Sequence, residues 1–298
     1  MSNIKKVKNG ISYETNGWIY VAIKGKAKER GYAYGKLVAY EMKDIQKTLQ
    51  FTTYFDLGVK WDFFIDAAAK HFKPKIMEKF PEFYEEMVGF AEGCTAGGTP
   101  ISIDEVVAWN NWFTLTGSWF FNMPDEERIA VKGISESNVM SKEGGASDRC
   151  SAFIANGDWT ADGKIVVAHN NFSNFVDGQF ARVVLDLKPD KGARMLIQGF
   201  VGWIWSGTDF FVNSYGIIGT ETTIGGFFPY ENNIPISCRI RNAMQYGRTM
   251  DECVEMLLDG NSGDYANSWL FGDTKTNEIL RLELGLRFHN VERTKNGY

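Results

Sequence analysis

The middle of the chain reads Asp148-Arg149-Cys150-Ser151-Ala152-Phe153, and this stretch decides how the fold is interpreted. It follows a polar segment, residues 132–147, whose Ser, Gly, Lys and Glu content is typical of a loop that can be cut. A β-like run comes directly after it. Cys150 at this junction is either a small buried residue or a nucleophile that becomes a new N-terminus when the Arg149–Cys150 bond is cleaved.

The apolar residues after Cys150 recur with a period of two, which indicates strands. Residues 151–155 and 164–169 are predicted to form a hairpin about Asp162-Gly163. That turn would bring residues 169–175 close to the sulfur. A thiolate needs a nearby proton acceptor or cation, so His169 is a candidate partner; the alternative is a structural histidine at a strand end.

The first half of the chain is predicted to be mainly helical. A hairpin about Asn16-Gly17 is expected at 11–23, and a Ser102–Glu105 capping box opens a largely apolar helix. Asn110 and Asn111 inside that helix either bond to neighbouring backbone or line a substrate pocket. The further expected helices cover residues 28–50, 61–72 and 74–93.

The second half is predicted to be rich in strands. Two helices are expected at 236–247 and 250–259, the second with a capping box at Thr249 and Glu252. The order of helices, many antiparallel strands, two helices and more strands predicts an α+β fold with sheets stacked between helical layers.

Composition excludes several classes of protein. The chain has 298 residues, is 44% hydrophobic and 23% charged, and can therefore form a sizeable core. A net charge of −5 without a basic face argues against a nucleic-acid partner. No apolar run approaches the ~18 residues of a membrane span, so stable membrane insertion is not expected. Residues 1–8 lack the apolar core of a signal peptide.

The cysteines and histidines offer no metal motif. Four cysteines and three histidines are scattered without a C-x-x-C pair, so neither a zinc site nor another cofactor is expected from the sequence.

Three segments in order carry a family resemblance. The first is Cys-Ser-Ala-Phe at 150–153 with Ala-His-Asn at 168–170. The second is Ser-Gly-Thr-Asp-Phe-Phe at 206–211, leading to Gly-Thr-Glu-Thr-Thr-Ile-Gly at 219–225. The third is Asn-Ser-Gly-Asp-Tyr-Ala-Asn-Ser-Trp at 261–269. Together they resemble the phospholipase B-like family, a branch of the N-terminal nucleophile (Ntn) hydrolases.

The resemblance implies an αββα four-layer sandwich, in which two stacked, mainly antiparallel sheets lie between helical layers. It also implies autocatalytic cleavage between Arg149 and Cys150. Residues 1–149 would then be a mainly helical segment with a linker, released or displaced on maturation. Residues 150–298 would be the catalytic β-rich segment, and the two together would form one Ntn domain.

The resemblance assigns roles to individual residues. Cys150 would be the nucleophile and its new α-amine the base, with an ordinary pKa of about 8. His169 would orient the nucleophile or the substrate, and the Asn267 amide would help to bind the oxyanion, which is typically worth ~3 kcal/mol. Asn170 and Thr222 are possible further contacts to substrate or oxyanion. Glu221 is alternatively a buried structural acid.

The expected reaction is hydrolysis of an acyl amide of a small molecule, lipid or peptide through a thioester. The alternatives are a phospholipase B or lysophospholipase that cleaves esters, and a non-catalytic binding protein. Related cysteine-type bile salt hydrolases and penicillin acylases carry an Arg and an Asp where this chain has His169, so their substrates do not transfer. By resemblance the protein is expected to be secreted or lysosome-like, and the chain ends sooner after Trp269 than in animal members, as in a compact version or one lacking C-terminal residues.

Overall fold

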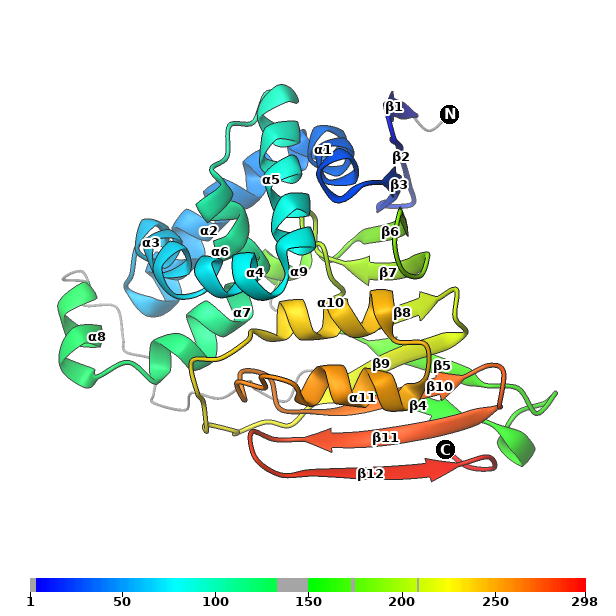
Figure 1. Ribbon diagram of the computed structural model, residues 1–298. Helices are drawn as coiled ribbons and strands as arrows, with labels where there is room; N and C mark the ends of the chain where they lie inside the picture. Colours follow the sequence, from blue (N-terminus) through cyan, green and yellow to red (C-terminus); the bar gives the residue numbers. More distant parts are fainter. Residues whose placement is uncertain (1–3, 133–149, 173–174, 208) are drawn as a thin grey trace.

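The computed structural model describes residues 4–132, 150–172, 175–207 and 209–298, so Arg149 and most of the polar segment before it lie outside the described residues. Its main element is one ten-stranded mixed sheet (Figure 1). In spatial order the strands are β1 (Lys5–Val7), β2 (Gly10–Thr15), β3 (Trp18–Gly25), β6 (Val183–Pro189), β7 (Met195–Gly199), β8 (Phe210–Asn213), β9 (Ile217–Thr223), β10 (Asn267–Asp273), β11 (Glu278–Leu284) and β12 (His289–Thr294). The remaining strands, β4 (Ser151–Ala155) and β5 (Val166–Asn170), form a separate hairpin.

The helices of the described residues lie mostly in the first half of the chain. They are α1 (Ala27–Leu37), α2 (Ala39–Leu57), α3 (Trp61–His71), α4 (Lys73–Lys79), α5 (Pro81–Ala96), α6 (Ile103–Asn110), α7 (Trp112–Thr114), a π-helical turn (Leu115–Trp119), α8 (Asp125–Val131) and α9 (Phe175–Gly178). A 3-10 turn (Gly157–Trp159), α10 (Ile236–Tyr246) and α11 (Met250–Leu258) complete the set. Within the described ranges, none of these helices has the length and apolar character to cross a bilayer.

In both predicted capping boxes, the hydrogen bond from the backbone N–H of the glutamate to the Ser or Thr side chain is confirmed. The Ser102 hydroxyl accepts a hydrogen bond from the Glu105 backbone N–H at 3.0 Å, and α6 begins at the next residue. Thr249 Oγ1 accepts from the Glu252 N–H at 3.1 Å and starts α11 in the same way. Each bond satisfies one of the N–H groups that the first turn of a helix leaves without a partner.

The expected four-layer αββα sandwich is wrong. The hairpin of β2 and β3 does not belong to a separate sheet, because β3 pairs in parallel with β6, with Ile19 opposite Val183. That one pairing joins strands from both halves of the chain into a single sheet of ten strands. The second sheet is only the two-stranded β4–β5 hairpin, which lies against β9 and β10.

The two sides of this part of the sheet are covered differently. The Asn213 side chain on β8 donates to the Met244 carbonyl of α10 at 3.1 Å, so α10 covers that face. Gly272 on β10 points to the other face, where a Cβ would meet Ile165 and Ile154 of the β4–β5 hairpin at 3.0 and 3.1 Å. The hairpin and α10 therefore lie on opposite faces of the sheet (Figure 1).

The helices of the first half are tied to residues of the second half of the chain. Trp109 Nε1 donates to the Val201 carbonyl at 2.8 Å. Arg30 on α1 and Arg241 on α10 both bond to the buried carboxylate of Glu86 on α5. Residues before and after position 149 thus share one core.

Candidate functional site

The predicted hairpin that begins at Cys150 is confirmed. Strands β4 and β5 are antiparallel, with Ser151 opposite Asn170 and Ala152 opposite His169. Cys150 precedes β4 by one residue and is half-buried. The register therefore carries the His169 imidazole to the end of the hairpin where the thiol lies.

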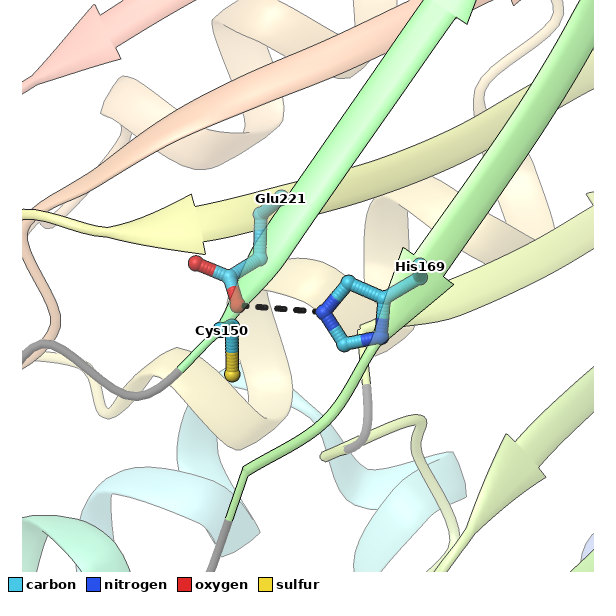
Figure 2. Close-up of side chains that lie close together, drawn as sticks. All are labelled: Cys150, His169 and Glu221. Carbon is cyan, nitrogen blue, oxygen red and sulfur yellow. Dashed lines mark ion pairs between the residues drawn. The ribbon is translucent and has the colours of Figure 1, made fainter.

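The third member of the site comes from β9. Strand β8 ends its pairing where Phe210 lies opposite Thr220, and β9 continues past it to Thr223. Glu221 lies in this overhang. Figure 2 shows its carboxyl beside the thiol of Cys150 and the imidazole of His169. One ligand atom from each of the three side chains lies within 4.8 Å of the other two.

Two members of this Cys150–His169–Glu221 cluster, His169 and Glu221, lie close together and are buried. His169 Nε2 lies 4.0 Å from Glu221 Oε1, and both side chains are almost fully buried. Among the described residues, His169 Nε2 has no hydrogen-bond partner. Burial lowers the pKa of His169 to about 4, so the imidazole is neutral at pH 7 and one ring nitrogen can accept a proton.

Neighbouring polar groups hold Cys150 in place. Thr222 Oγ1 donates to the carbonyl of Cys150 at 2.9 Å, so this residue fixes the backbone of the proposed nucleophile. Asn171 Nδ2 lies 4.0 Å from the sulfur. Asn170, which the sequence favoured, is exposed and lies 3.5 Å from the Ser151 hydroxyl. Asn171 is therefore the nearer amide.

Behind Glu221 lies a buried acid cluster, Asp209–Glu221–Tyr265. The Tyr265 hydroxyl lies 2.9 Å from Asp209 Oδ2 and 3.2 Å from Glu221 Oε1. A phenol has one proton, so it can donate to only one of these oxygens. The other oxygens, Asp209 Oδ1 and Glu221 Oε2, have no N–H or O–H donor among the described residues. A proton shared between the two carboxyls satisfies both.

The pKa shifts agree with a shared proton. Burial raises the pKa of Asp209 to about 6. Burial, followed by the charge of Asp209, holds the pKa of Glu221 well above its usual range. Two carboxyls in contact cannot both ionise cheaply, so the pair retains a proton near neutral pH.

Asn267 lies at the start of β10, on the same face of the sheet as Glu221. Asn267 pairs with Thr223, and Glu221 pairs with Trp269, so the four side chains share one face. Asn267 is fully buried, yet neither Nδ2 nor Oδ1 finds a hydrogen-bond partner in the described part of the chain. Buried amides are normally satisfied, and such an orphan is a candidate ligand contact.

Asn110 and Asn111 bond to backbone carbonyls, the first of the two interpretations given for them. The Asn110 side chain donates to the Val106 and Gly202 carbonyls at 3.1 Å each. Asn111 Nδ2 donates to the Val107 carbonyl at 2.7 Å. Both amides hold backbone together inside the core.

A cavity of about 520 Å³ lies between α3, the π-helical turn and the loop at Tyr230. Its lining includes His71, Trp119 and Asn232, and no member of the Cys150–His169–Glu221 cluster. This cavity is therefore separate from the Cys150–His169–Glu221 cluster.

Sequence reasoning missed Asp209, Tyr265 and Asn171 and treated Glu221 only as a structural acid. The signal for Asp209 and Glu221 is that each is the one charged residue of its segment, 206–211 and 217–225 respectively. Arg149 lies outside the described residues, so the expected cleavage position is not described by the structure.

Comparison with known proteins finds a distant relative of this chain. No protein-family model matches the sequence. An uncharacterized protein from Archaeoglobus fulgidus is 25% identical over 271 residues, a match that covers 88% of this chain and 42% of the relative. The chain thus spans about two-fifths of the length of that curated relative.

Proposed function

We propose that the protein is a cysteine hydrolase that cleaves an acyl amide of a small molecule, lipid or peptide through a thioester on Cys150. The observation that carries this proposal is the convergence of Cys150, His169 and Glu221 from three strands or strand ends to within 4.8 Å. A thiol, a neutral imidazole and an orienting acid are the parts that nucleophilic acyl transfer requires.

The reaction has two halves. The Cys150 sulfur attacks the amide carbonyl while its proton passes to a base, and the amine leaves with a proton, so that a thioester forms. Water then attacks the thioester, releases the carboxylic acid and restores the thiol. The negative oxygen of each tetrahedral intermediate needs donors; Asn267 Nδ2, which has no partner among the described residues, and Asn171 Nδ2 are the proposed ones.

The base depends on whether the chain is cut. In the proposal, cleavage of Arg149–Cys150 frees the α-amine of Cys150, whose ordinary pKa of about 8 suits it to accept the thiol proton. His169 then orients the thiol and the substrate. In an uncut chain His169 is the group that must accept the proton, with a pKa lowered by burial to about 4, which makes it a weak base.

Membership of the phospholipase B-like family remains a proposal that rests on the three segments at 150–170, 206–225 and 261–269. It favours an acyl substrate and leaves amide and ester open, since the same thioester serves both. A fatty-acyl amide and a diacyl phospholipid assayed side by side decide between an amidase and a phospholipase B.

The test combines mass spectrometry with active-site labelling. We expect two fragments divided at Arg149–Cys150, and one acyl group on Cys150 after treatment with a thiol-directed acylating agent. Cys150→Ala should abolish both, whereas Cys253→Ser, a buried cysteine on α11, should change neither. An intact chain that neither labels at Cys150 nor hydrolyses either substrate would overturn the hydrolase and leave a binding protein.

A further inference from the structure

The Cys150–His169–Glu221 cluster is also a set of metal ligands. It offers a sulfur, an imidazole nitrogen and a carboxylate oxygen, each within 4.8 Å of the other two (Figure 2). Sulfur and imidazole together select thiophilic ions such as zinc over magnesium or calcium, which prefer oxygen. The three residues lie far apart in sequence, so no motif spacing reveals them.

We propose that this cluster binds a thiophilic divalent cation, with zinc as the biological form, and that the bound ion holds the hydrolase inactive. The regulatory half rests on the proposed function, because zinc would occupy the thiol that attacks the substrate. The binding half rests only on the three side chains.

The three ligand atoms must move closer together to bind one ion, by roughly an ångström at most for the pairs that include the sulfur. Tetrahedral zinc, with bonds of about 2.0–2.3 Å, places neighbouring ligand atoms about 3.5 Å apart. His169 Nε2 and Glu221 Oε1 are 4.0 Å apart, so a shift of roughly half an ångström suffices for this pair. The backbones of β5 and β9 are held by hydrogen bonds to neighbouring strands. Rotation of the two side chains can supply this shift without moving either strand.

The surroundings match what zinc ligands usually have. His169 Nε2 is buried and has no hydrogen-bond partner among the described residues, so it can turn to an ion without breaking a bond. The Tyr265 hydroxyl lies 3.2 Å from Glu221 Oε1, the oxygen that faces His169, and 2.9 Å from Asp209 Oδ2, so it is placed to support the Glu221 carboxylate. Such supporting hydrogen bonds are typical of carboxylate ligands.

Maturation would complete the ligand set. Cleavage before Cys150 leaves an α-amine that can bind the same ion as the thiolate and close a five-membered chelate ring. The site would then have four protein ligands, as closed, non-catalytic zinc sites do. We therefore expect the cleaved protein to bind zinc at least ~10-fold more tightly than an uncleaved form, such as an Arg149→Pro variant that mass spectrometry shows to be intact.

The experiment titrates the metal-free full chain with Co²⁺, a spectroscopic substitute for zinc. Ligation by Cys150 should give a sulfur-to-cobalt charge-transfer band in the near ultraviolet. Added Zn²⁺ should displace the Co²⁺ and abolish this band. The band should disappear in Cys150→Ser, and Co²⁺ affinity should fall at least ~10-fold in Glu221→Gln and His169→Gln. Cys253→Ser and His289→Gln are matched controls, because Cys253 is on α11 and His289 is an exposed residue on β12.

The outcomes separate the metal site from the hydrolase. The metal site is overturned by a chain that shows no band, or whose band survives in Cys150→Ser. A band in a chain that hydrolyses no acyl substrate supports the metal site and counts against the hydrolase. If the hydrolysis rate rises with added Zn²⁺ rather than falling, the inhibitory role is wrong and the ion is a cofactor.

Discussion

Two buried polar clusters in this molecule differ in how their charges are matched. In the first, Glu86 on α5 accepts hydrogen bonds from Arg30 and Arg241, each at 2.8 Å, and all three side chains are fully buried. In the acid cluster, Asp209 and Glu221 lie together with Tyr265. In the described part of the chain, no lysine or arginine forms an ion pair with either of these two acids.

The difference separates structure from function. A buried carboxylate between two guanidiniums has its charge compensated, and its removal strands the cations. Two buried acids without a cation keep a proton instead, at a cost to stability that natural proteins accept mainly at functional sites. Glu221 of the acid cluster also lies within 4.8 Å of the thiol and imidazole, whereas the Glu86 cluster joins helices from both halves of the chain.

The largest expected effect is on stability, in the Glu86 cluster. Glu86→Gln removes the carboxylate from two buried guanidiniums and should lower the free energy of unfolding by about 3–5 kcal/mol, measured by urea denaturation. Glu85→Gln changes an exposed residue on the same helix and should stay within about 0.5 kcal/mol. Equal midpoints for the two variants would show that the pairing is unimportant.

The next effect is on catalysis, in the acid cluster. Glu221→Gln should slow hydrolysis by about 100-fold, because Glu221 lies 4.0 Å from His169 Nε2 and shares the cluster with the thiol in the proposed mechanism. Its free energy of unfolding should change by less than about 1 kcal/mol, since a neutral amide replaces a carboxyl that is already protonated. Glu283→Gln on β11 is the matched control and should leave the rate unchanged. A normal rate in Glu221→Gln would reduce Glu221 to a structural acid.

A smaller effect appears as a pH dependence. The raised pKa of Asp209, about 6, means that the native state holds this proton more tightly than the unfolded chain, so its contribution to stability is lost as pH rises from about 4 through 6. Asp209→Asn has no such proton to lose. Between pH 4 and 7 its free energy of unfolding should therefore rise by on the order of 1–2 kcal/mol relative to that of the unsubstituted protein. Asparagine also tolerates the left-handed backbone there, with φ of 58°.

Asp186 should give a pH dependence of stability with the opposite sign to that of Asp209. The hydrogen bond from Arg194 lowers the pKa of Asp186, so this carboxylate stabilises the native state above the pKa of an unfolded aspartate. Asp186→Asn should therefore destabilise the protein at pH 7, and the difference should vanish as pH falls below about 4. Urea denaturation at several pH values measures both variants; parallel pH profiles would contradict the assignment of the acid cluster.

The smallest expected effect on stability is that of breaking an ion pair at the surface, Arg281–Glu292. Arg281 on β11 donates to Glu292 on β12 at 2.9 Å, with both side chains about half-exposed. Arg281→Gln should change the free energy of unfolding by less than about 0.5 kcal/mol and by still less in high salt. A loss comparable to that of Glu86→Gln would mean that burial is not what separates the clusters.

Local signals in the sequence predicted the hairpins and the nucleophile region. Asn16-Gly17 forms the expected two-residue turn between β2 and β3, whereas Asp162-Gly163 lies within the longer connection 156–165 that joins β4 to β5. The parallel pairing of β3 with β6 has no such local signal, because its strands are separated by the whole helical region. This is why the single large sheet was not anticipated.

Helix boundaries were predicted less well for a related reason. One helix was expected over 28–50, but the chain breaks at Val38, whose φ of −113° and ψ of 17° are not helical. The apolar pattern continues across the break because both helices bury that side. Periodicity records which side is buried and does not record a change of direction.

The candidate site was half predictable. Cys150 and His169 are brought together by one hairpin, which a turn and a period of two define. Glu221 reaches the thiol in the part of β9 that extends past β8, and strand lengths in a sheet depend on packing. Asn171 was missed because a one-residue difference in register decides which of two neighbouring amides faces the sulfur.

The place of β3 within the sheet has a consequence for a cut chain. Strand β3 is hydrogen-bonded to β2 on one side and to β6 on the other, so a break at Arg149–Cys150 would sever the polypeptide and leave the sheet intact. The two pieces would behave as a heterodimer with a buried, covalently unlinked interface. Expressed as separate genes, residues 1–149 and 150–298 would then be natural halves for fragment complementation, each supplying strands that the other lacks.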